Sequence, residues 1–291
     1  FPRINGVSTS IQTFRAELAR LGHATTLVAP AYPAPHCDDP HTVRIPSRAV
    51  LLDPEDRAMH WKVLRGAHRK LAHARFDLVH VHTPFLANYA GIRFARRWGV
   101  PVVATYHTLF EEYLFHYVPF VPRGAMRAAA RRISRSQCHA LDAVVVPSTA
   151  MREKLQRYGV RSRVEIVPTG IPLPDFSGGD GARFRARYRI EPSRPLLVYV
   201  GRVAFEKNID FLLRALALVR HKVPEALLVV CGEGPASASL ARTAGELGLG
   251  ESVRFVGYLD RATDLRDCYR AADALVFASR TETKGLVLLE A

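Results

Sequence analysis

The sequence lacks the features of a membrane-spanning, zinc-binding or disulfide-stabilised protein. No stretch approaches the roughly 20 apolar residues that a membrane-spanning helix requires. The four cysteines are far apart in the sequence and form no C-x-x-C pair, which argues against a zinc site and a disulfide scaffold. No tandem repeat, low-complexity tract or signal peptide is visible, although a missing start would hide a signal peptide. We expect a globular protein in a reducing cytoplasm.

Lysine is also scarce, although the chain is strongly basic. Only six of its 41 basic residues are Lys, and its formal net charge is +14. Such a charge fits a nucleic acid, an anionic membrane or a phosphorylated substrate as partner, and it equally fits arginines on solvated surfaces. The length of 291 residues, 48% of them hydrophobic, allows two domains or one large one.

Apolar runs alternate with segments of helical periodicity in two consecutive blocks. Strands are expected at residues 25–29, 76–83, 102–105, 142–148, 163–167, 196–200, 226–230, 253–256 and 274–278. Helices are expected at residues 8–21, 61–74, 87–98, 123–135, 150–158, 209–219 and 265–272. Residues 31–60 are rich in Pro and Asp and predict loops with short strands. This alternation predicts an α/β fold with parallel sheets.

Proline and glycine mark a domain boundary. They are dense over residues 168–174 and 177–181, which is typical of a linker. The sequence therefore predicts an N-terminal domain at 1–175, a linker at 176–194 and a C-terminal domain at 195–291.

The last thirteen residues carry the clearest pattern for a binding site. An apolar strand is followed by a loop containing Gly285 and then by an apolar helical run, and unpaired amides at a helix start attract a diphosphate. Glu282 and Glu290 flank that point, and carboxylates accept hydrogen bonds from sugar hydroxyls. Together they indicate a phosphorylated sugar. Alternatively, Ser279-x-x-Glu282 is a capping box and Glu290 an ordinary surface residue.

Three further side chains follow the ends of predicted strands. Arg202 and Lys207 come after the strand at 196–200, where two cations could hold a diphosphate or could simply be solvated. His107 comes after the strand at 102–105, and the carboxyl ends of parallel strands line the ligand crevice. A structural role for His107 is the alternative.

Two other local patterns are ambiguous. His80 and His82 lie on one face of a predicted strand, but no third metal ligand is evident, so a metal site is not expected. Gly232-x-Gly234-Pro235 predicts a tight turn at which a ligand can approach the backbone.

The residues 281–291 resemble the E-x7-E signature of retaining glycosyltransferase family 4, with Glu282 and Glu290 as its two acidic residues. The Gly201-Arg202 to Lys207 segment, the Gly232–Pro235 turn and Asn5-Gly6-Val7 are similar to family motifs in the same order. Lys284 departs from the pattern, because many members have Phe there. The resemblance implies the GT-B fold, in which two Rossmann-like domains face a cleft. It also implies a fragment that lacks the first strand and the C-terminal end.

The resemblance implies a role for each site residue. Arg202 and Lys207 would neutralise the leaving diphosphate, Glu282 would hold donor-sugar hydroxyls, Glu290 the ribose, and His107 the donor sugar. Further donor contacts are implied at Gly6, Gly234, Gly285 and Leu286. No metal and no cofactor are implied, and the donor would be a nucleotide-sugar, UDP-glucose in preference to GDP-mannose.

A lipid acceptor is the next expectation. The aromatic residues 108–117 resemble the acceptor-side loop of members that glycosylate diacylglycerol. In the helix at 123–135, Met126, Ala130 and Ile133 share one half. The other half carries arginines: Arg123, Arg127, Arg131, Arg132 and Arg135. Such a helix could lie on the inner face of the cell membrane, or it could face the core with a solvated basic side.

The favoured reading is a hexosyltransferase acting on a membrane lipid such as diacylglycerol. A GDP-mannose-dependent mannosyltransferase acting on a lipid or polysaccharide is the alternative. A nucleic-acid-binding protein and a non-catalytic nucleotide-sugar binder are the other classes, and no nucleic acid is expected as a partner.

Overall fold

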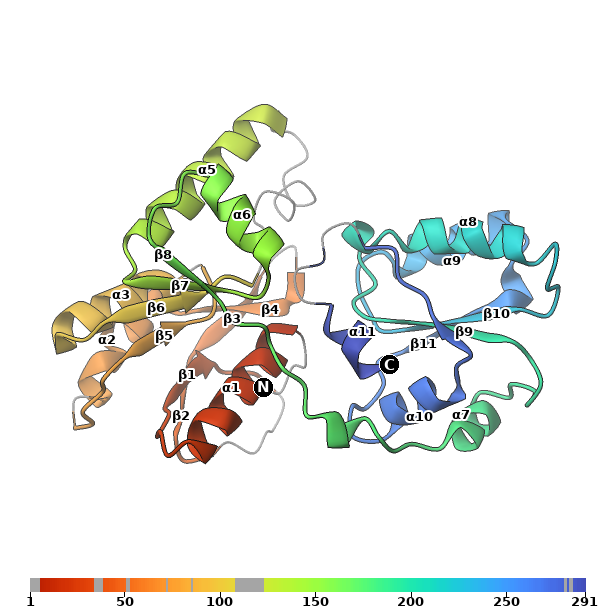
Figure 1. The fold of residues 1–291 in the computed structure, drawn as a ribbon, viewed down its shortest axis with the longest axis horizontal. Coiled ribbons are helices and arrows are strands. Elements are labelled where there is room, and N and C mark those ends of the chain that lie inside the picture. The colour runs from red at the N-terminus through yellow and green to blue at the C-terminus, as the bar shows by residue number, and fades with distance from the viewer. Residues whose placement is uncertain are drawn as a thin grey trace. The chain divides into compact units, whose positions relative to one another are not determined.

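A computed structural model describes residues 6–33, 39–50, 53–71, 73–84, 86–107, 123–279, 282 and 285–291. The chain divides into two compact units (Figure 1). Unit 1 is Phe1–Gly170 and unit 2 is Ile171–Ala291. Both contain parallel sheets joined by helices, as the alternation in the sequence predicted.

The main sheet of unit 1 has four parallel strands in the order β5-β6-β7-β8. Its strands are β5 (Val79–Val81), β6 (Val102–Thr105), β7 (Ala143–Val146) and β8 (Arg163–Ile166). The connecting helices are α3 (Leu86–Trp98), α5 (Arg123–His139) and α6 (Thr149–Arg157). Val144 and Val146 of β7 are fully buried, so the sheet carries the core of this unit.

Helix α3 packs unusually close to the sheet at Gly91. A Cβ atom placed on Gly91 would lie 2.4 Å from Cγ2 of Val81 in β5. A larger residue would force the helix and the strand apart, so glycine sets their spacing here.

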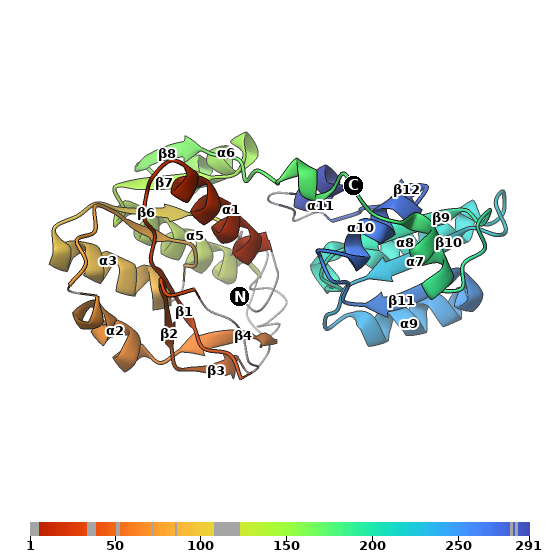
Figure 2. The ribbon, with the colours of Figure 1, turned by 90° about the horizontal axis from the view of Figure 1, so that it is seen from below.

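The N-terminal part of unit 1 adds two smaller sheets (Figure 2). Its elements are α1 (Gly6–Arg20), β1 (Leu27–Pro30), β2 (Thr42–Ile45), β3 (Ser47–Val50), β4 (Asp53–Met59) and α2 (Trp61–Lys70). Strands β1 and β2 are parallel, whereas β3 and β4 pair antiparallel. This antiparallel pair departs from the all-parallel expectation. It lies in the region predicted to hold loops with short strands.

Unit 2 is a four-stranded parallel sheet in the order β11-β10-β9-β12. The strands are β9 (Leu196–Val200), β10 (Leu227–Cys231), β11 (Val253–Gly257) and β12 (Ala274–Leu275). The helices are α7 (Gly181–Arg187), α8 (Ile209–Val219), α9 (Ser237–Glu246), α10 (Asp264–Ala271) and α11 (Leu286–Glu290). The described residues of this unit also form three short 3₁₀ helices: Leu173–Asp175, Phe205–Lys207 and Gly250–Ser252.

Helices cover both faces of this sheet (Figure 1). Leu228 and Val230 of β10 pack in one cluster with α8 and α9, while Leu227 and Val229 pack in a second cluster with α7 and α10. Successive side chains of a strand point to opposite faces, so a strand buried on both faces reads as a continuous apolar run. That is why these strands were recognisable in the sequence.

The residues predicted as a linker, 176–194, lie in unit 2 and contain α7. Asp180 caps α7 by accepting a hydrogen bond from the Arg183 amide at 3.0 Å. Asp267 of α10 accepts from Arg183 Nε at 2.6 Å and from the Asp180 amide at 2.6 Å. A Cβ on Gly181 would lie 2.6 Å from the Arg270 carbonyl oxygen. Within the segment predicted as a linker, Asp180 is therefore a helix cap, and Gly181 allows α7 to pack closely against α10.

The basic face of α5 is exposed as expected, with one error. Arg127, Arg131 and Arg135 are exposed, while Met126 and Ala130 are buried. Ile133 was predicted to share the apolar half, but it is 46% exposed. The buried side is instead completed by Ser134, Gln137 and Cys138, so the packed face lies further round the helix than the apolar residues alone indicated. The side chain of Arg123 lies outside the described residues.

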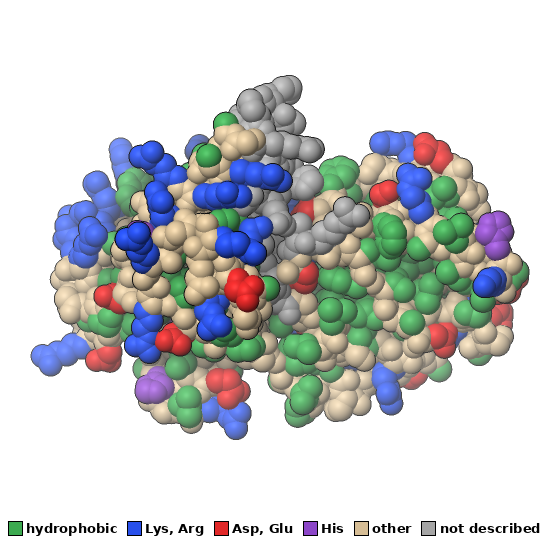
Figure 3. Space-filling view, turned by 45° about the horizontal axis from the view of Figure 1, so that its top comes forward, with side chains coloured by type: hydrophobic (Ala, Val, Ile, Leu, Met, Phe, Trp, Pro, Cys, Tyr) green, Lys and Arg blue, Asp and Glu red, His purple; other side chains and the backbone are tan. Residues whose placement is uncertain are grey.

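The net charge is distributed unequally between the two units. Unit 1 contains 24 Lys and Arg against 12 Asp and Glu, a net charge of +12. Unit 2 contains 17 Lys and Arg against 15 Asp and Glu, a net charge of +2. Figure 3 shows Lys and Arg side chains crowded over unit 1 and mainly hydrophobic ones over the visible face of unit 2. Within the described part of the chain, no helix is long and apolar enough to cross a membrane.

Two cysteines that are distant in sequence meet in the core of unit 2. The Sγ atoms of Cys231 in β10 and Cys268 in α10 are 3.5 Å apart, and both residues are buried.

A third cysteine, Cys138, is buried in unit 1, and burial raises the pKa of its thiol to about 12. Buried thiols of this kind are unreactive.

Candidate functional site

The loops that leave the carboxyl ends of the unit 2 strands are tied to one another. The Val203 amide, after β9, donates to the Glu233 carbonyl, after β10, at 2.8 Å. The Gly232 amide donates to the carbonyl of Gly257, at the end of β11, at 2.7 Å. Asn208 Nδ2 donates to the Ala278 carbonyl, after β12, at 3.3 Å. Parallel strands end at a common edge, and this edge is where α/β sheets bind ligands.

Gly234 is needed for the close packing of two of these loops. Its φ is +154°, and a Cβ there would lie 2.4 Å from the Val203 carbonyl oxygen. The turn predicted from Gly-x-Gly-Pro is thus explained by contact with the loop after β9. A nucleotide-sugar contact at Gly234 stays a prediction.

Lys207 and Glu282 meet at this edge, although 75 residues separate them in the sequence. Lys207 Nζ lies 2.9 Å from Glu282 Oε2, and their side chains are 20% and 28% exposed. The other carboxylate oxygen of Glu282 accepts from the Gly285 amide at 3.1 Å. One carboxylate therefore fixes both the ammonium group and the backbone that leads into α11.

Arg202 lies on the same loop as Lys207. Its Nη1 is 3.8 Å from Glu206 Oε1, and its carbonyl oxygen accepts from the Tyr199 hydroxyl at 3.0 Å. Burial raises the pKa of Tyr199, so this hydroxyl stays protonated and remains a donor. Both predicted diphosphate-binding cations thus have an acidic neighbour, and no pattern in the sequence had indicated Glu206.

Gly285 and Leu286 form the start of α11. Gly285 has a φ of +58° at the N-cap position, without a side-chain cap, and Leu286 is buried. A capping box at Ser279 therefore does not begin this helix. Helix α11 is five residues long. Lys284, the departure from the family pattern, lies outside the described residues.

Glu290 is buried rather than on the surface of α11. Its side chain is 1% exposed, and it forms an ion pair with Arg261, which follows β11. Its second oxygen accepts from the Tyr269 hydroxyl of α10 at 3.1 Å. Burial and, after it, the charge of Glu290 raise the pKa of Tyr269. The structure gives Glu290 a structural function that the spacing did not reveal, and its predicted ribose contact stays a prediction.

Three histidines gather in unit 1 at the ends of β5 and β6. His82 Nδ1 and His107 Nε2 are 3.0 Å apart, and the His80 and His82 rings are 4.1 Å apart. His80 Nε2 is 2.7 Å from Thr105 Oγ1, and Phe14 of α1 packs against the rings of His80 and His82. His107 is 7% exposed. The sequence placed His80 and His82 on one face, but nothing in it paired His82 with His107.

The structure describes only some of the other residues that were predicted to contribute to the site in unit 1. Gly6 is the first residue of α1 and is exposed. The aromatic residues 108–117 lie outside the described residues. Among the residues that the structure describes, no group of three or more His, Cys, Asp or Glu is arranged to hold a metal ion.

The site residues thus form separate groups. His107 and Gly6 belong to unit 1, and the other predicted residues belong to unit 2. Within unit 2, Lys207, Glu282 and Gly285 are in direct contact, whereas Glu290 pairs with Arg261 and Tyr269. A single trough that collects all of them remains a prediction.

Comparison with known families now assigns the chain. Residues 4–174 match the model of Glycosyltransferase Family 4, and residues 180–291 match the model of Glycosyl transferases group 1. The chain belongs to glycosyltransferase family 4. The two matches follow the two units and leave only a few residues between them unmatched.

Three curated relatives of this family 4 chain show which enzymes it resembles in sequence. An alpha-monoglucosyldiacylglycerol synthase from Streptococcus pneumoniae is 31% identical over 100% of this chain and 66% of its own length. The enzyme of the same name from Acholeplasma laidlawii is 26% identical over 100% of this chain and 75% of its own length. A D-inositol 3-phosphate glycosyltransferase from Nocardia farcinica is 35% identical over 79% of this chain and 52% of its own length. The chain therefore spans about half to three quarters of the length of these relatives.

Solved structures show the fold of this family 4 chain. A sucrose-phosphate synthase from Thermosynechococcus elongatus has a TM-score of 0.75 at 23% identity, covering 98% of this chain and 73% of its own. WaaG, a glycosyltransferase of lipopolysaccharide biosynthesis, has a TM-score of 0.70 at 19% identity, covering 99% and 75%. HepE of Anabaena in complex with UDP-glucose has a TM-score of 0.62 at 18% identity, covering 79% and 59%. The expected GT-B fold is confirmed.

Histidine 80 should make unit 1 sensitive to mild acid. Burial lowers its pKa from 6.5 to about 4. The unfolded chain takes up this proton as the pH falls below 6.5, whereas the folded chain resists until about 4, so stability is lost across that window, by up to roughly 3 kcal/mol. Urea denaturation from pH 7 to pH 4 should show a flatter dependence for His80→Gln. The exposed control His221→Gln should follow the wild type, and an equally steep loss in His80→Gln would contradict this role.

The burial of Glu290 leads to a second expectation. Glu290→Gln keeps the shape of the side chain but removes the charge that faces Arg261, and it should lower the free energy of unfolding by about 3 kcal/mol. Denaturation with urea measures this change, with the exposed Glu153→Gln as the matched control. Equal stabilities of the two variants would show that the Arg261 and Tyr269 contacts do not support the unit.

Proposed function

We propose that this chain is a retaining glycosyltransferase that moves a hexose from a nucleotide-sugar, with UDP-glucose favoured, to a membrane lipid such as diacylglycerol. The observation that carries the proposal is the match of the whole chain, at 31% identity, to an alpha-monoglucosyldiacylglycerol synthase. The GT-B neighbour HepE, bound to UDP-glucose in its crystal, supports a uridine nucleotide as the donor.

The chemistry we assign to unit 2 is charge neutralisation at the carboxyl edge of its sheet. Lys207 and Arg202 would take up negative charge on the diphosphate as it leaves, a preorganised electrostatic contribution that is often the largest in catalysis. Each cation already has a carboxylate beside it, at 2.9 Å for Lys207 and 3.8 Å for Arg202, which holds it in position before charge develops. Glu282 would also accept hydrogen bonds from hydroxyls of the donor sugar.

The transfer step needs no protein nucleophile in this proposal. The acceptor hydroxyl attacks the anomeric carbon from the side on which the carbon–oxygen bond to the diphosphate breaks. The leaving phosphate oxygen takes the proton of that hydroxyl, so the configuration is retained and the atoms balance. His107 would contact the donor sugar, with its ring oriented by His82 at 3.0 Å.

Unit 1 would supply the contact with an anionic membrane. It carries +12 of the net charge, and α5 exposes Arg127, Arg131 and Arg135 on one side and the apolar Ile133 on another. Cations and an exposed apolar side chain on one helix suit the interface of anionic lipid headgroups. This surface would hold the enzyme at the inner face of the cell membrane, where a lipid acceptor resides.

Activity with two donors and two acceptors tests the reaction. The intact chain is incubated with UDP-glucose or GDP-mannose and with diacylglycerol vesicles or soluble D-inositol 3-phosphate, and the products are identified by mass spectrometry. We expect a glucosylated lipid. A mannosylated lipid would show that the donor is GDP-mannose and not UDP-glucose. A product formed only from the inositol phosphate would show that the acceptor is not a lipid. The absence of a lipid product with either donor would end the lipid proposal.

Replacing Lys207 tests the assigned role. Lys207→Ala should lower kcat by about 100-fold or more, because one preorganised charge at the leaving group is removed. The control Lys222→Ala removes an exposed lysine of the same unit and should leave kcat unchanged. A Lys207→Ala variant with wild-type turnover would refute the role of this cation.

Reversing charges on α5 tests membrane attachment. The variant with Arg127→Glu, Arg131→Glu and Arg135→Glu should lose co-sedimentation with vesicles that contain phosphatidylglycerol, since each basic residue near an anionic surface contributes about 1 kcal/mol. Added salt should weaken the wild-type interaction in the same way. The single exposed Arg242→Glu change on α9 serves as control, and undiminished binding of the triple variant would rule this surface out.

A further inference from the structure

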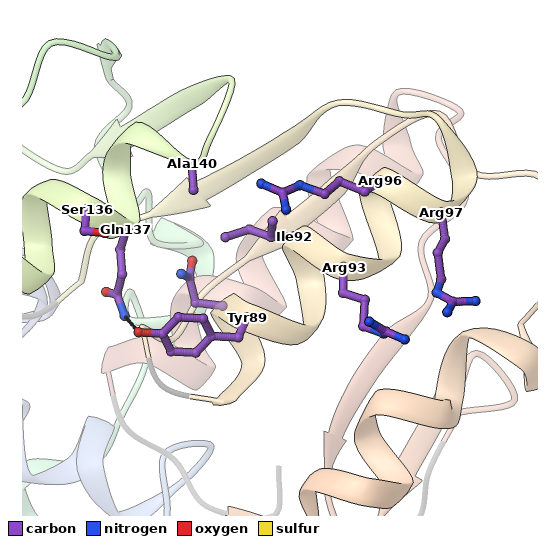
Figure 4. A pocket seen from close by; sticks show the side chains of 9 residues that line it. Tyr89, Ile92, Arg93, Arg96, Arg97, Ser136, Gln137 and Ala140 are labelled. Carbon is purple, nitrogen blue, oxygen red and sulfur yellow. Dashed lines mark hydrogen bonds between the residues drawn. The ribbon is translucent and has the colours of Figure 1, made fainter.

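Helices α3 and α5 of unit 1 line a half-open cavity that the proposed reaction does not use. The volume of this cavity is about 400 Å³. Figure 4 shows side chains from both helices around it. The lining consists of Asn88, Tyr89, Ile92, Arg93, Arg96, Arg97, Ser136, Gln137 and Ala140. A volume of this size is typical of small-molecule sites.

The polar groups of this lining are mostly hydrogen-bond donors. Three of the nine residues are arginines, and none of these nine is acidic. Tyr89 and Ser136 add hydroxyl groups and Asn88 adds an amide. A guanidinium group donates only and always carries its charge, so the chemistry of the cavity fits an anion with several acceptor atoms.

Asn88 contributes to the lining of the cavity a buried donor group without a partner in the described part of the chain. The residue is 3% exposed, and its Nδ2 atom has no hydrogen-bond partner among the residues that the structure describes. Nε of Arg93, five residues further along α3, is buried and unpaired within the same described residues. Buried donors are rarely left unsatisfied, because each such group costs stability. An acceptor placed in the cavity could satisfy the Asn88 amide.

The surrounding contacts leave Arg96 to a ligand. Arg97 Nη1 lies 3.1 Å from Nε2 of His68 in α2, which holds Arg97 toward that helix. Gln137 Nε2 donates to the Pro84 carbonyl at 2.6 Å and to the Tyr89 hydroxyl at 3.4 Å, which closes one end of the cavity. In Figure 4, Arg96 extends over Ile92 toward Ala140 of α5. Arg93 and Arg96 form no ion pair within the described part of the chain.

We propose that this cavity binds a phosphate ester between α3 and α5, with Arg96 and Asn88 as its donors. Guanidinium groups match phosphate oxygens with paired, charge-assisted hydrogen bonds. The volume leaves room for a glycerol or sugar moiety attached to the phosphate. The same chemistry is offered by a soluble phosphate ester and by the headgroup of an anionic phospholipid. The proposal is independent of the transfer reaction, because binding is measured without a donor.

Titration calorimetry with the intact chain tests binding of a soluble ester. The probes are sn-glycerol 3-phosphate and inorganic phosphate, and the variants are Arg96→Ala, Asn88→Asp and the matched control Arg157→Ala, an exposed arginine of α6. Arg96→Ala removes one cation, and Asn88→Asp places a carboxylate where an amide donates. We expect at least about tenfold weaker binding for both variants and wild-type binding for the control. Arg96 is exposed, so its variant keeps the test valid if Asn88→Asp does not fold.

A parallel arm distinguishes the membrane source. Vesicles of phosphatidylcholine with and without phosphatidylglycerol are titrated with the same four proteins. Saturable binding of glycerol phosphate that the cavity variants lose assigns a soluble ester. Binding only to phosphatidylglycerol vesicles, weakened in the cavity variants beyond the Arg157→Ala control, assigns the headgroup. No binding of any probe, or equal binding by Arg96→Ala and Arg157→Ala, overturns the proposal.

Discussion

The parallel pairing of β9 with β10 and β12 is the constraint on which the candidate donor site depends. All the strands of this sheet end at one edge, so segments far apart in the sequence are delivered to the same place. Lys207 reaches Glu282 at 2.9 Å only because the loops after β9 and β12 are neighbours. Close backbone packing at Gly234 holds the loop after β10 against the loop after β9. The ion pair is therefore a product of sheet topology.

Much of this arrangement was predictable, because buried parallel strands are continuous apolar runs. The residues Leu227 to Val230 had to be a strand covered on both faces, and the structure places α7 and α10 on one face and α8 and α9 on the other. Polar residues that follow such strands within two positions, such as Arg202 and His107, could be assigned to the carboxyl edge of their sheet by the same reasoning. The sequence thus indicated at which edge of each sheet the candidate site residues lie.

Other features could not be predicted, because they depend on partners that no local pattern names. The burial of Glu290 follows from Arg261 and Tyr269, which lie 29 and 21 residues earlier in the chain. The exposure of Ile133 follows from the polar residues Ser134 and Gln137 on the packed side of α5. Likewise, two histidines that follow adjacent strands become a pair only when β5 and β6 are in register. Long-range contacts of this kind decide which polar residues are structural.

The placement of α7 has a practical consequence for dissecting the chain. Phe184 and Ile190 are 2% and 4% exposed within the core of unit 2, and the buried carboxylate of Asp267 has Arg183 as its partner. A truncation that begins at residue 195 would strip away that covering layer and leave Asp267 without its counter-ion. Any attempt to produce unit 2 separately should therefore begin near residue 171, upstream of the glycine-rich segment that resembles a natural junction.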